Sequence, residues 1–134
     1  MNGIAMTQTF DVVVIGAGPG GYIAAVRAAQ LGLSTACIEG WRNAKGELAL
    51  GGTCLNVGCI PAKELLETAH VYRTVSEAAA FGIDAGPPRI DWSVTQQRKQ
   101  AVVDELVGGI GMLLKGRKVT VYEGHGRLQA GRTV

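Results

Sequence analysis

The sequence lacks a long apolar run and a strong charge of one sign, and its first residues lack the pattern expected of a signal peptide. No run of 18 apolar residues is present, which argues against a membrane span. The formal net charge is only +2 and no basic stripe appears, so no nucleic-acid partner is expected. Residues 1–10 have neither the basic nor the apolar part of a signal peptide. We therefore expect a cytoplasmic protein with no membrane partner.

Cysteine is also scarce. Three cysteines are too few, and an odd number, for the disulfide framework of a small secreted domain. In a reducing compartment a cysteine pair is more often catalytic, redox-active or metal-binding than structural. Cys54 and Cys59 are the two that lie close together.

Length and composition predict a globular chain with a single core. The 134 residues are 47% hydrophobic and 18% charged, without an internal repeat or an interdomain linker. We expect one domain over residues 1–134. The 20 glycines cluster at Gly16–Gly21, Gly51–Gly58 and Gly108–Gly111, which indicates sharp turns or close approach to another group.

The first 40 residues predict a strand–helix–strand unit. Residues 10–16 (FDVVVIG) favour a strand buried on both faces, as in a parallel sheet. A helix follows from Pro19 to Gln30, with Gly32 ending it, and residues 33–39 form a second strand. A unit of about 30 residues is the size of a parallel crossover. The expected fold class is α/β, Rossmann-like, with a mainly parallel sheet.

The remaining segments predict a loop, two helices and a further strand. We expect a polar loop over 40–52, followed by a helix from near Thr53 to about Glu77 that is disturbed around Gly58 and Pro61. A loop over 81–88 then leads to a helix that is capped by Asp91 or Ser93 and runs to Lys115. A strand over 118–123 follows, and another begins over 127–134.

A nucleotide-binding fingerprint lies inside the first unit. Residues 16–21 (GAGPGG) fit GxGxxG, follow a predicted strand and open a predicted helix. Glu39 ends the second strand, 39 − 16 = 23 residues beyond Gly16. The alternative is a glycine-rich turn of an unrelated α/β fold with Glu39 merely at the surface. The fingerprint alone does not separate FAD from NAD.

Each part of the fingerprint has a physical task. Gly16 permits a tight turn, Gly18 lets a pyrophosphate approach the backbone, and Gly21 lets helix and strand pack closely. The pyrophosphate then lies at the helix amino terminus, where free N–H groups and the helix dipole favour an anion. Glu39 can accept hydrogen bonds from an adenosine ribose and would repel a 2′-phosphate, which disfavours NADP.

The spacing of Cys54 and Cys59 is unusual for a disulfide. On a regular helix this offset rises about 7.5 Å, beyond the usual disulfide Cα separation of under about 7 Å. A bond between them requires a distorted turn, which Gly58 and Pro61 are suited to provide. Strained, accessible disulfides are the labile and catalytic ones.

Two other interpretations of this pair remain open. The two cysteines could be free core thiols, or they could be half of a zinc site. Partners for a metal are poor, because Cys37 lies in a predicted buried strand while His70 and His125 are isolated. We expect no metal site, and we interpret Cys37 as a small core residue.

Taken together, the motifs resemble a known family. DVVVIGAGPGGYIAA, an acid after the second strand and GGTCLNVGCIPAK are similar to the amino terminus of the pyridine nucleotide–disulfide oxidoreductases. Their spacing and the -LNVGCIP- string are most like the dihydrolipoamide dehydrogenase branch. KVTVYEGHGRL resembles that family's next strand and FAD-contacting turn, so the resemblance covers nearly all of the chain.

The resemblance implies a set of site residues. FAD rather than NAD would occupy the fingerprint, with Cys59 nearest the flavin and Cys54 as the outer sulfur that exchanges with substrate. The residues implied to hold FAD are Gly16, Gly18, Pro19, Gly20, Gly21 and Glu39 on its ADP half, Gly52 and Thr53 along the pyrophosphate and flavin, Lys63 at the flavin and Gly126 near the adenine.

The resemblance also implies an activity and its partners. Dihydrolipoamide on a lipoyl carrier domain would reduce the disulfide, the dithiol would pass electrons to FAD, and NAD+ would take a hydride. The family acts as a homodimer, and its NAD-binding and dimerisation domains do not fit in 134 residues. We therefore expect an incomplete FAD-binding segment that is inactive alone. Ala62 stands where the family usually has serine, which weakens the assignment to this branch.

Two alternative functions remain. One is a sister flavoenzyme that reduces glutathione disulfide or mercuric ion. The other is a nucleotide-binding module without catalysis.

Overall fold

The computed structural model describes residues 7–134. Residues 1–6, part of the segment on which the expectation about a signal peptide rests, lie outside the described residues. The chain forms two compact units, one of residues 7–52 with Ile110–Val134 and one of Thr53–Gly109, and each is described by itself. Within residues 7–134, no helix is both long and apolar enough for a membrane span.

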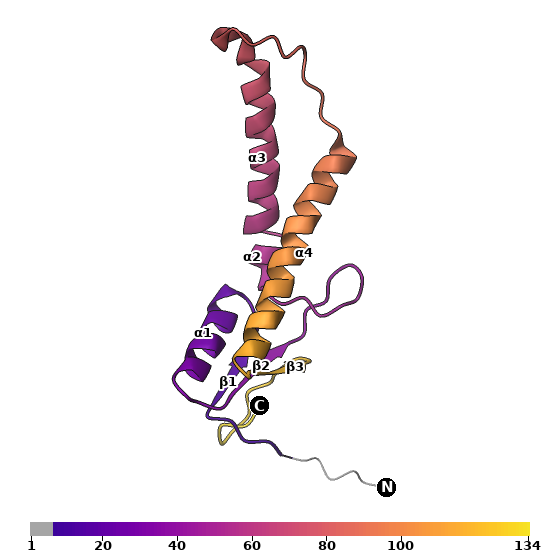
Figure 1. Ribbon diagram of the computed structural model, residues 1–134. Coiled ribbons are helices and arrows are strands. Elements are labelled where there is room, and N and C mark those ends of the chain that lie inside the picture. Colours follow the sequence, from indigo (N-terminus) through magenta and orange to yellow (C-terminus); the bar gives the residue numbers. More distant parts are fainter. Residues whose placement is uncertain (1–6) are drawn as a thin grey trace. The chain divides into compact units, whose positions relative to one another are not determined.

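The first unit is built on a parallel sheet. Its strands are β1 (Val12–Ile15), β2 (Thr35–Glu39) and β3 (Thr120–Glu123), in the order β1-β2-β3. Both pairings are parallel, with Val12 opposite Thr35 and Glu39 opposite Glu123. The crossover helix α1 (Pro19–Gln30) packs against β1 and β2 (Figure 1). This arrangement confirms the predicted Rossmann-like α/β class.

Helix α1 has the predicted bounds because its end signals are local. Pro19 is the first helical residue, where its fixed φ suits the helix and its missing N–H costs nothing. Gly32, with φ +84°, follows the last turn. Its buried face carries Ala25, Val26 and Ala28, which are small enough to bring the helix close to the sheet.

The prediction that β1 is buried on both faces is wrong. Val13 is 38% exposed and Ile15 49%, while the alternate residues are half-buried. Val13 borders an open hollow of about 590 Å³ that Phe10 and Tyr122 also line. These two rings pack edge to face at 6.1 Å between centroids. Apolar composition alone did not reveal that, among the described residues, one face of the strand lies open.

A side-chain clamp joins the starts of β1 and β2. The Asp11 carboxylate accepts hydrogen bonds from the backbone N–H and hydroxyl of Ser34, at 2.8 and 2.6 Å. These bonds, the hydroxyl first, lower the pKa of Asp11 below its ordinary value. The clamp's contribution to stability is therefore present above the ordinary aspartate pKa and is lost as pH falls through the lowered one.

The second unit is helical. It contains α2 (Gly52–Asn56, whose first residue belongs to the first unit), α3 (Cys59–Ser76), the 3₁₀ turn η1 (Ala78–Phe81) and most of α4 (Trp92–Gly116). The α2–α3 break confirms the disturbance predicted near Gly58.

Polar side chains fix the helices of this unit. Asp91 caps α4 by accepting hydrogen bonds from the N–H groups of Ser93 and Val94, at 2.9 and 3.2 Å, as predicted. Arg98 on α4 forms an ion pair with Glu64 on α3.

Of the two elements predicted near the end of the chain, the helix running to Lys115 is present and the strand beginning at residue 127 is not. The last two turns of α4 lie in the first unit and bury Ile110 and Leu114. Residues 127–134 form one antiparallel bridge, Gln129 to Thr133, rather than a strand. The domain count of one stays a prediction.

Gly21 is the position in α1 that tolerates a side chain least. A Cβ placed there would overlap the carbonyl oxygen of Gly16 and lie 2.9 Å from its carbon. We predict that G21A lowers the free energy of unfolding by about 1–3 kcal/mol, because backbone must shift to relieve the overlap. Urea denaturation of the chain measures it.

G20A is the matched control for this substitution. Gly20 lies in the same turn of α1, and a Cβ there meets nothing within 4 Å. Alanine should therefore be neutral or stabilising by up to about 1 kcal/mol. Equal losses in the two variants would contradict the steric account.

Candidate dinucleotide and disulfide sites

The glycine turn between β1 and α1 presents backbone donors. Gly16, at φ +94°, donates its N–H to the carbonyl of Ile38 at 2.7 Å, which holds the turn at the end of β2. Gly18 is the N-cap of α1 and offers no side-chain acceptor to the first-turn amides, and that turn contains no acid. Such a terminus has unpaired N–H groups and a positive dipole end, which suit a phosphate.

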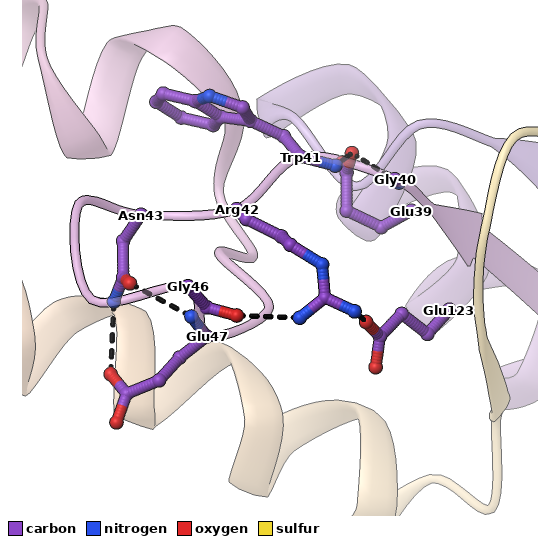
Figure 2. Close-up of polar contacts among 8 residues, drawn as sticks. All are labelled: Glu39, Gly40, Trp41, Arg42, Asn43, Gly46, Glu47 and Glu123. Carbon is purple, nitrogen blue, oxygen red and sulfur yellow. Dashed lines mark hydrogen bonds and ion pairs between the residues drawn. The ribbon is translucent and has the colours of Figure 1, made fainter.

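Glu39 accepts three backbone N–H groups and so joins two segments of the chain. One carboxylate oxygen accepts the N–H of Ala17 in the glycine turn at 2.7 Å. The other accepts the N–H groups of Gly40 and Trp41, at 2.8 and 2.9 Å (Figure 2). Carboxylate oxygens accept more than one hydrogen bond each, so Glu39 retains capacity for a ribose hydroxyl. The sequence predicted the ligand contact but not these amide contacts.

A pocket of about 320 Å³ opens at the carboxyl ends of all three strands. This edge is where ligands bind in open α/β sheets. Its lining residues are Ile15, Gly16, Ile38, Glu39, Gly40, Trp41, Gly124, His125 and Gly126. The structure thus brings together three residues predicted from the sequence, Gly16, Glu39 and Gly126.

Sequence reasoning missed several of the lining residues, above all Trp41 and His125. The signal for His125 was available, because a Gly-His-Gly triplet directly after a strand indicates a turn at the ligand edge. Trp41 had no such signal, since it lies in a polar loop.

Protein atoms pack so close to two of the predicted glycines that neither position has room for a side chain. A Cβ on Gly126 would lie 3.0 Å from Ile15 Cγ1 and 3.2 Å from Ile38 Cδ1. A Cβ on Gly52, whose φ is +61°, would lie 2.8 Å from the Cα of Gly18. The amino terminus of α1 and the carboxylate of Glu39 fit a dinucleotide, the first its pyrophosphate and the second its ribose.

Pro19 and Gly20 are the first two residues of α1, and both are exposed. They lie directly after Gly18, as the fingerprint predicted. The roles of the fingerprint residues toward a cofactor stay predictions.

Cys54 and Cys59 form a disulfide with a Cα–Cα distance of 4.7 Å. The predicted distortion provides this approach, since Cys54 is in α2 and Cys59 begins α3. Gly58 lies between them, where a Cβ would be 3.0 Å from the Thr53 carbonyl oxygen and 3.3 Å from the Cys54 Cα. Cys54 is half-buried and Cys59 exposed, which argues against two core thiols. In the bonded state neither sulfur is a thiolate ligand for zinc.

The third cysteine behaves differently. Cys37 on β2 is fully buried and free, as predicted. Burial, followed by the nearby charge of Glu39, raises the pKa of its thiol, so Cys37 is a poor nucleophile.

Lys63 and Thr53 flank the disulfide along the chain. Lys63 lies one turn beyond Cys59 on the same face of α3, and its side chain is exposed. Thr53 immediately precedes Cys54 in α2 and is exposed too. Their proximity to the disulfide follows from helix geometry, while their contact with a flavin stays a prediction.

Comparison with known proteins decides the family. Residues 10–134 match the model of the pyridine nucleotide-disulphide oxidoreductases. This chain belongs to the pyridine nucleotide-disulphide oxidoreductase family. It is therefore not an unrelated α/β fold with a chance glycine turn.

Individual members of the pyridine nucleotide-disulphide oxidoreductase family show which enzymes the chain is similar to. The chain is 50% identical over 123 residues to a dihydrolipoyl dehydrogenase of Bacillus subtilis (strain 168), covering 92% of this chain and 24% of the relative. It is 50% identical over 117 residues to a dihydrolipoyl dehydrogenase of Trypanosoma brucei brucei, covering 86% and 23%. The chain spans about a quarter of the length of the curated relatives it matches.

We predict that E39Q destabilises the chain even without ligand. Glutamine replaces one accepting oxygen with a donor, so the N–H of Ala17 or those of Gly40 and Trp41 lose their partner. The expected loss in the free energy of unfolding is about 1–3 kcal/mol. E105Q, at an exposed position of α4, is the control and should change it by less than about 0.5 kcal/mol. A free energy of unfolding of E39Q equal to that of the unsubstituted chain would contradict the role of Glu39 in holding the two backbone segments together.

We also predict that G58A impairs disulfide formation. The added methyl group would force Thr53 and Cys54 away, and so separate the two sulfurs. Thiol titration of the air-oxidised chain in denaturant should give 3 − 2 = 1 thiol for the unsubstituted chain, that of Cys37, and more for the variant. G109A, where a Cβ meets nothing within 4 Å, is the control and should match the unsubstituted chain. One thiol in G58A would overturn this prediction.

Proposed function

We propose that this chain is the FAD-binding, disulfide-carrying portion of an NAD-linked dihydrolipoyl dehydrogenase. The observation that carries the proposal is the Cys54–Cys59 disulfide in a chain that also carries the glycine turn and Glu39. Relatives bearing that name match most of this chain at 50% identity. The whole enzyme's activity extends over residues that this chain does not include.

Chain connectivity supports a disulfide close to the bound dinucleotide. Gly52 packs against Gly18 of the glycine turn, and the Gly51 N–H donates to the Ala17 carbonyl at 2.8 Å. Cys54 is two residues beyond Gly52, and two residues span at most about 7 Å. The Cα of Cys54 is therefore within about 7 Å of the Cα of Gly52, the residue proposed to lie along the pyrophosphate.

In the proposed site the residues divide by task. Gly16, Gly18 and Gly21 shape the turn that receives the pyrophosphate, with Pro19 and Gly20 as the first turn of α1. The cofactor's remaining partners are Glu39 at the ribose, Gly126 at the adenine, Gly52 and Thr53 along the pyrophosphate, and Lys63 at the flavin. FAD, when bound, supplies a two-electron acceptor that re-forms the disulfide and delivers a hydride to NAD+.

The disulfide performs the first half of the reaction by exchange. A thiolate of dihydrolipoamide attacks Sγ of Cys54, the Cys54–Cys59 bond breaks, and Cys59 leaves as a thiolate with the bonding electrons. The second substrate thiolate attacks the substrate sulfur of the mixed disulfide, which expels Cys54 as a thiolate and closes the ring of oxidised lipoamide. Two electrons then reside on the two cysteines, and the two substrate protons pass to solvent.

The local structure favours this exchange. Cys59 is the first residue of α3, where the helix dipole and free N–H groups stabilise a thiolate. The ammonium group of Lys63, four residues on, adds a positive charge on the same helix face. Cys59 is thus the better leaving group, which directs attack to Cys54.

The remaining parts of the proposal come from the similarity. The substrate is dihydrolipoamide on a lipoyl carrier domain, and the whole enzyme is a homodimer in the cytoplasm with its own NAD-binding domain. The name dihydrolipoyl dehydrogenase, which these relatives carry, supports the substrate.

We predict that C54S abolishes lipoamide-linked NAD+ reduction by the full-length enzyme that contains this sequence. Serine cannot form the mixed disulfide, so turnover should fall by at least about a thousandfold. C37A is the matched control, since Cys37 is buried and outside the disulfide, and it should keep turnover within about threefold.

Three outcomes would contradict the proposal. Turnover by C54S near that of the unsubstituted enzyme would remove the disulfide from the reaction. Reduction of glutathione disulfide or mercuric ion without lipoamide activity would assign a sister reductase. Purified protein without flavin absorption, and without a spectral change on adding a dithiol, would leave a module that binds no flavin.

A further inference from the structure

A second carboxylate lies at the edge of the dinucleotide pocket. Glu39 ends β2 and Glu123 ends β3, and the two are opposite each other in the parallel register. Glu39 lines the pocket itself, and Gly124, the residue after Glu123, lines it too. Two like charges on neighbouring strands repel each other and repel any anion that enters between them.

The two carboxylates are held in different ways. The oxygens of Glu39 accept three backbone N–H groups, which are neutral donors. Glu123 instead forms an ion pair with Arg42 (Figure 2). Arg42 also donates to the carbonyl of Gly46, so its guanidinium lies between the loop and the end of β3. Of these two carboxylates, Glu123 is the one that forms an ion pair with a cation among residues 7–134.

A small hairpin of residues 41–49 fixes the position of Arg42. Arg42 and Leu48 form an antiparallel bridge, and the Ala49 N–H donates to the Trp41 carbonyl at 2.9 Å. Asn43 closes the tip, where it accepts backbone N–H groups of Lys45 and Glu47. The hairpin fixes the backbone of Arg42 so that the side chain loses less freedom when it pairs with Glu123.

We propose that Arg42 is a positioning residue that determines which ligands the pocket accepts. By neutralising Glu123 it permits a ligand with a diphosphate, while Glu39 alone presents a negative charge to the ribose. This inference rests on the proposed dinucleotide function and deepens it. The chemical class of ligand is an adenosine diphosphate, either free or as part of a larger cofactor.

Removal of Arg42 would expose the charge of Glu123 to such a ligand. Glu123 is adjacent in sequence to the lining residue Gly124, with Cα atoms about 3.8 Å apart. A carboxylate beside the pocket repels a diphosphate that lies within about one Debye length of it, which is about 10 Å at 0.1 M salt. Uncharged adenosine does not feel this repulsion, which separates a charge effect from a general loosening of the hairpin.

The test is calorimetric titration of the 134-residue chain with ADP and, separately, with adenosine. The variants are R42Q, E123Q and R42Q/E123Q. The control is K45Q, which removes the same charge from an exposed residue of the same hairpin outside the pocket lining. Thermal unfolding of each variant shows whether it is folded.

The charge account gives a specific pattern. R42Q should bind ADP about threefold to tenfold more weakly at low salt, less so at high salt, and adenosine unchanged. E123Q and the double variant should bind ADP at least as tightly as the unsubstituted chain. K45Q should resemble the unsubstituted chain. E123Q keeps the test decisive even if R42Q fails to fold.

Other patterns would overturn the inference. In one such pattern, R42Q loses ADP and adenosine binding equally, and E123Q also binds ADP more weakly. This result would mean that Arg42 only stabilises the local structure and has no electrostatic effect on the ligand. R42Q equal to the unsubstituted chain would remove its role entirely. These results leave the dinucleotide function standing. An unsubstituted chain that binds neither ADP nor adenosine would instead reject both the proposed function and this inference.

Discussion

The carboxylate of Glu39 holds the pocket's backbone together. It accepts the N–H of Ala17 from the glycine turn and those of Gly40 and Trp41 from the start of the hairpin. The three amides come from two segments that β1 and β2 bring to the same edge of the sheet. The hairpin then returns to the turn through the Gly51–Ala17 hydrogen bond. Without this carboxylate, the glycine turn and the start of the hairpin would lose the side-chain link between them and keep only backbone hydrogen bonds such as Gly51–Ala17.

Local signals allowed the turn and its helix to be predicted from sequence. Pro19 and Gly32 mark the ends of α1, and the backbone overlap at Gly21 is the reason that only glycine fits there. The burial of β1 could not be predicted from local signals. A valine-rich strand indicates apolar neighbours, but which face they cover depends on chain far away in sequence, and Val13 and Ile15 are in fact exposed.

The residues of the pocket could also be predicted from sequence only in part. Gly16 and Glu39 were identified because one motif contains both, within the length of one crossover. Trp41 and the Arg42–Glu123 pair were not, because Arg42 and Glu123 are 81 residues apart. Their meeting depends on the register of β2 against β3, which places Glu123 opposite Glu39. Sequence patterns within one element carry no information about that register.

The disulfide lies between these two cases. Spacing alone showed that Cys54 and Cys59 could join only if the helix broke, and Gly58 indicated where. Spacing could not decide between a redox pair and two free thiols, because that choice depends on exposure. Cys59 is exposed at the start of α3, whereas Cys37 is enclosed in the sheet. Three chemically identical side chains thus differ in bonding and exposure: two form a disulfide and one is a free, buried thiol.

Charge placement gives the proposed site its selectivity. A free carboxylate near the ribose excludes a 2′-phosphate, yet the same negative field would also weaken binding of the diphosphate that every dinucleotide carries. The site resolves this conflict by position. The carboxylate of Glu39, which we propose faces the ribose, accepts backbone N–H groups, and the carboxylate of Glu123 forms an ion pair with Arg42. The amino terminus of α1 then presents its positive dipole end to the phosphates without a competing acid in its first turn. Selectivity against one phosphate and affinity for two others are therefore compatible only while the second carboxylate stays paired.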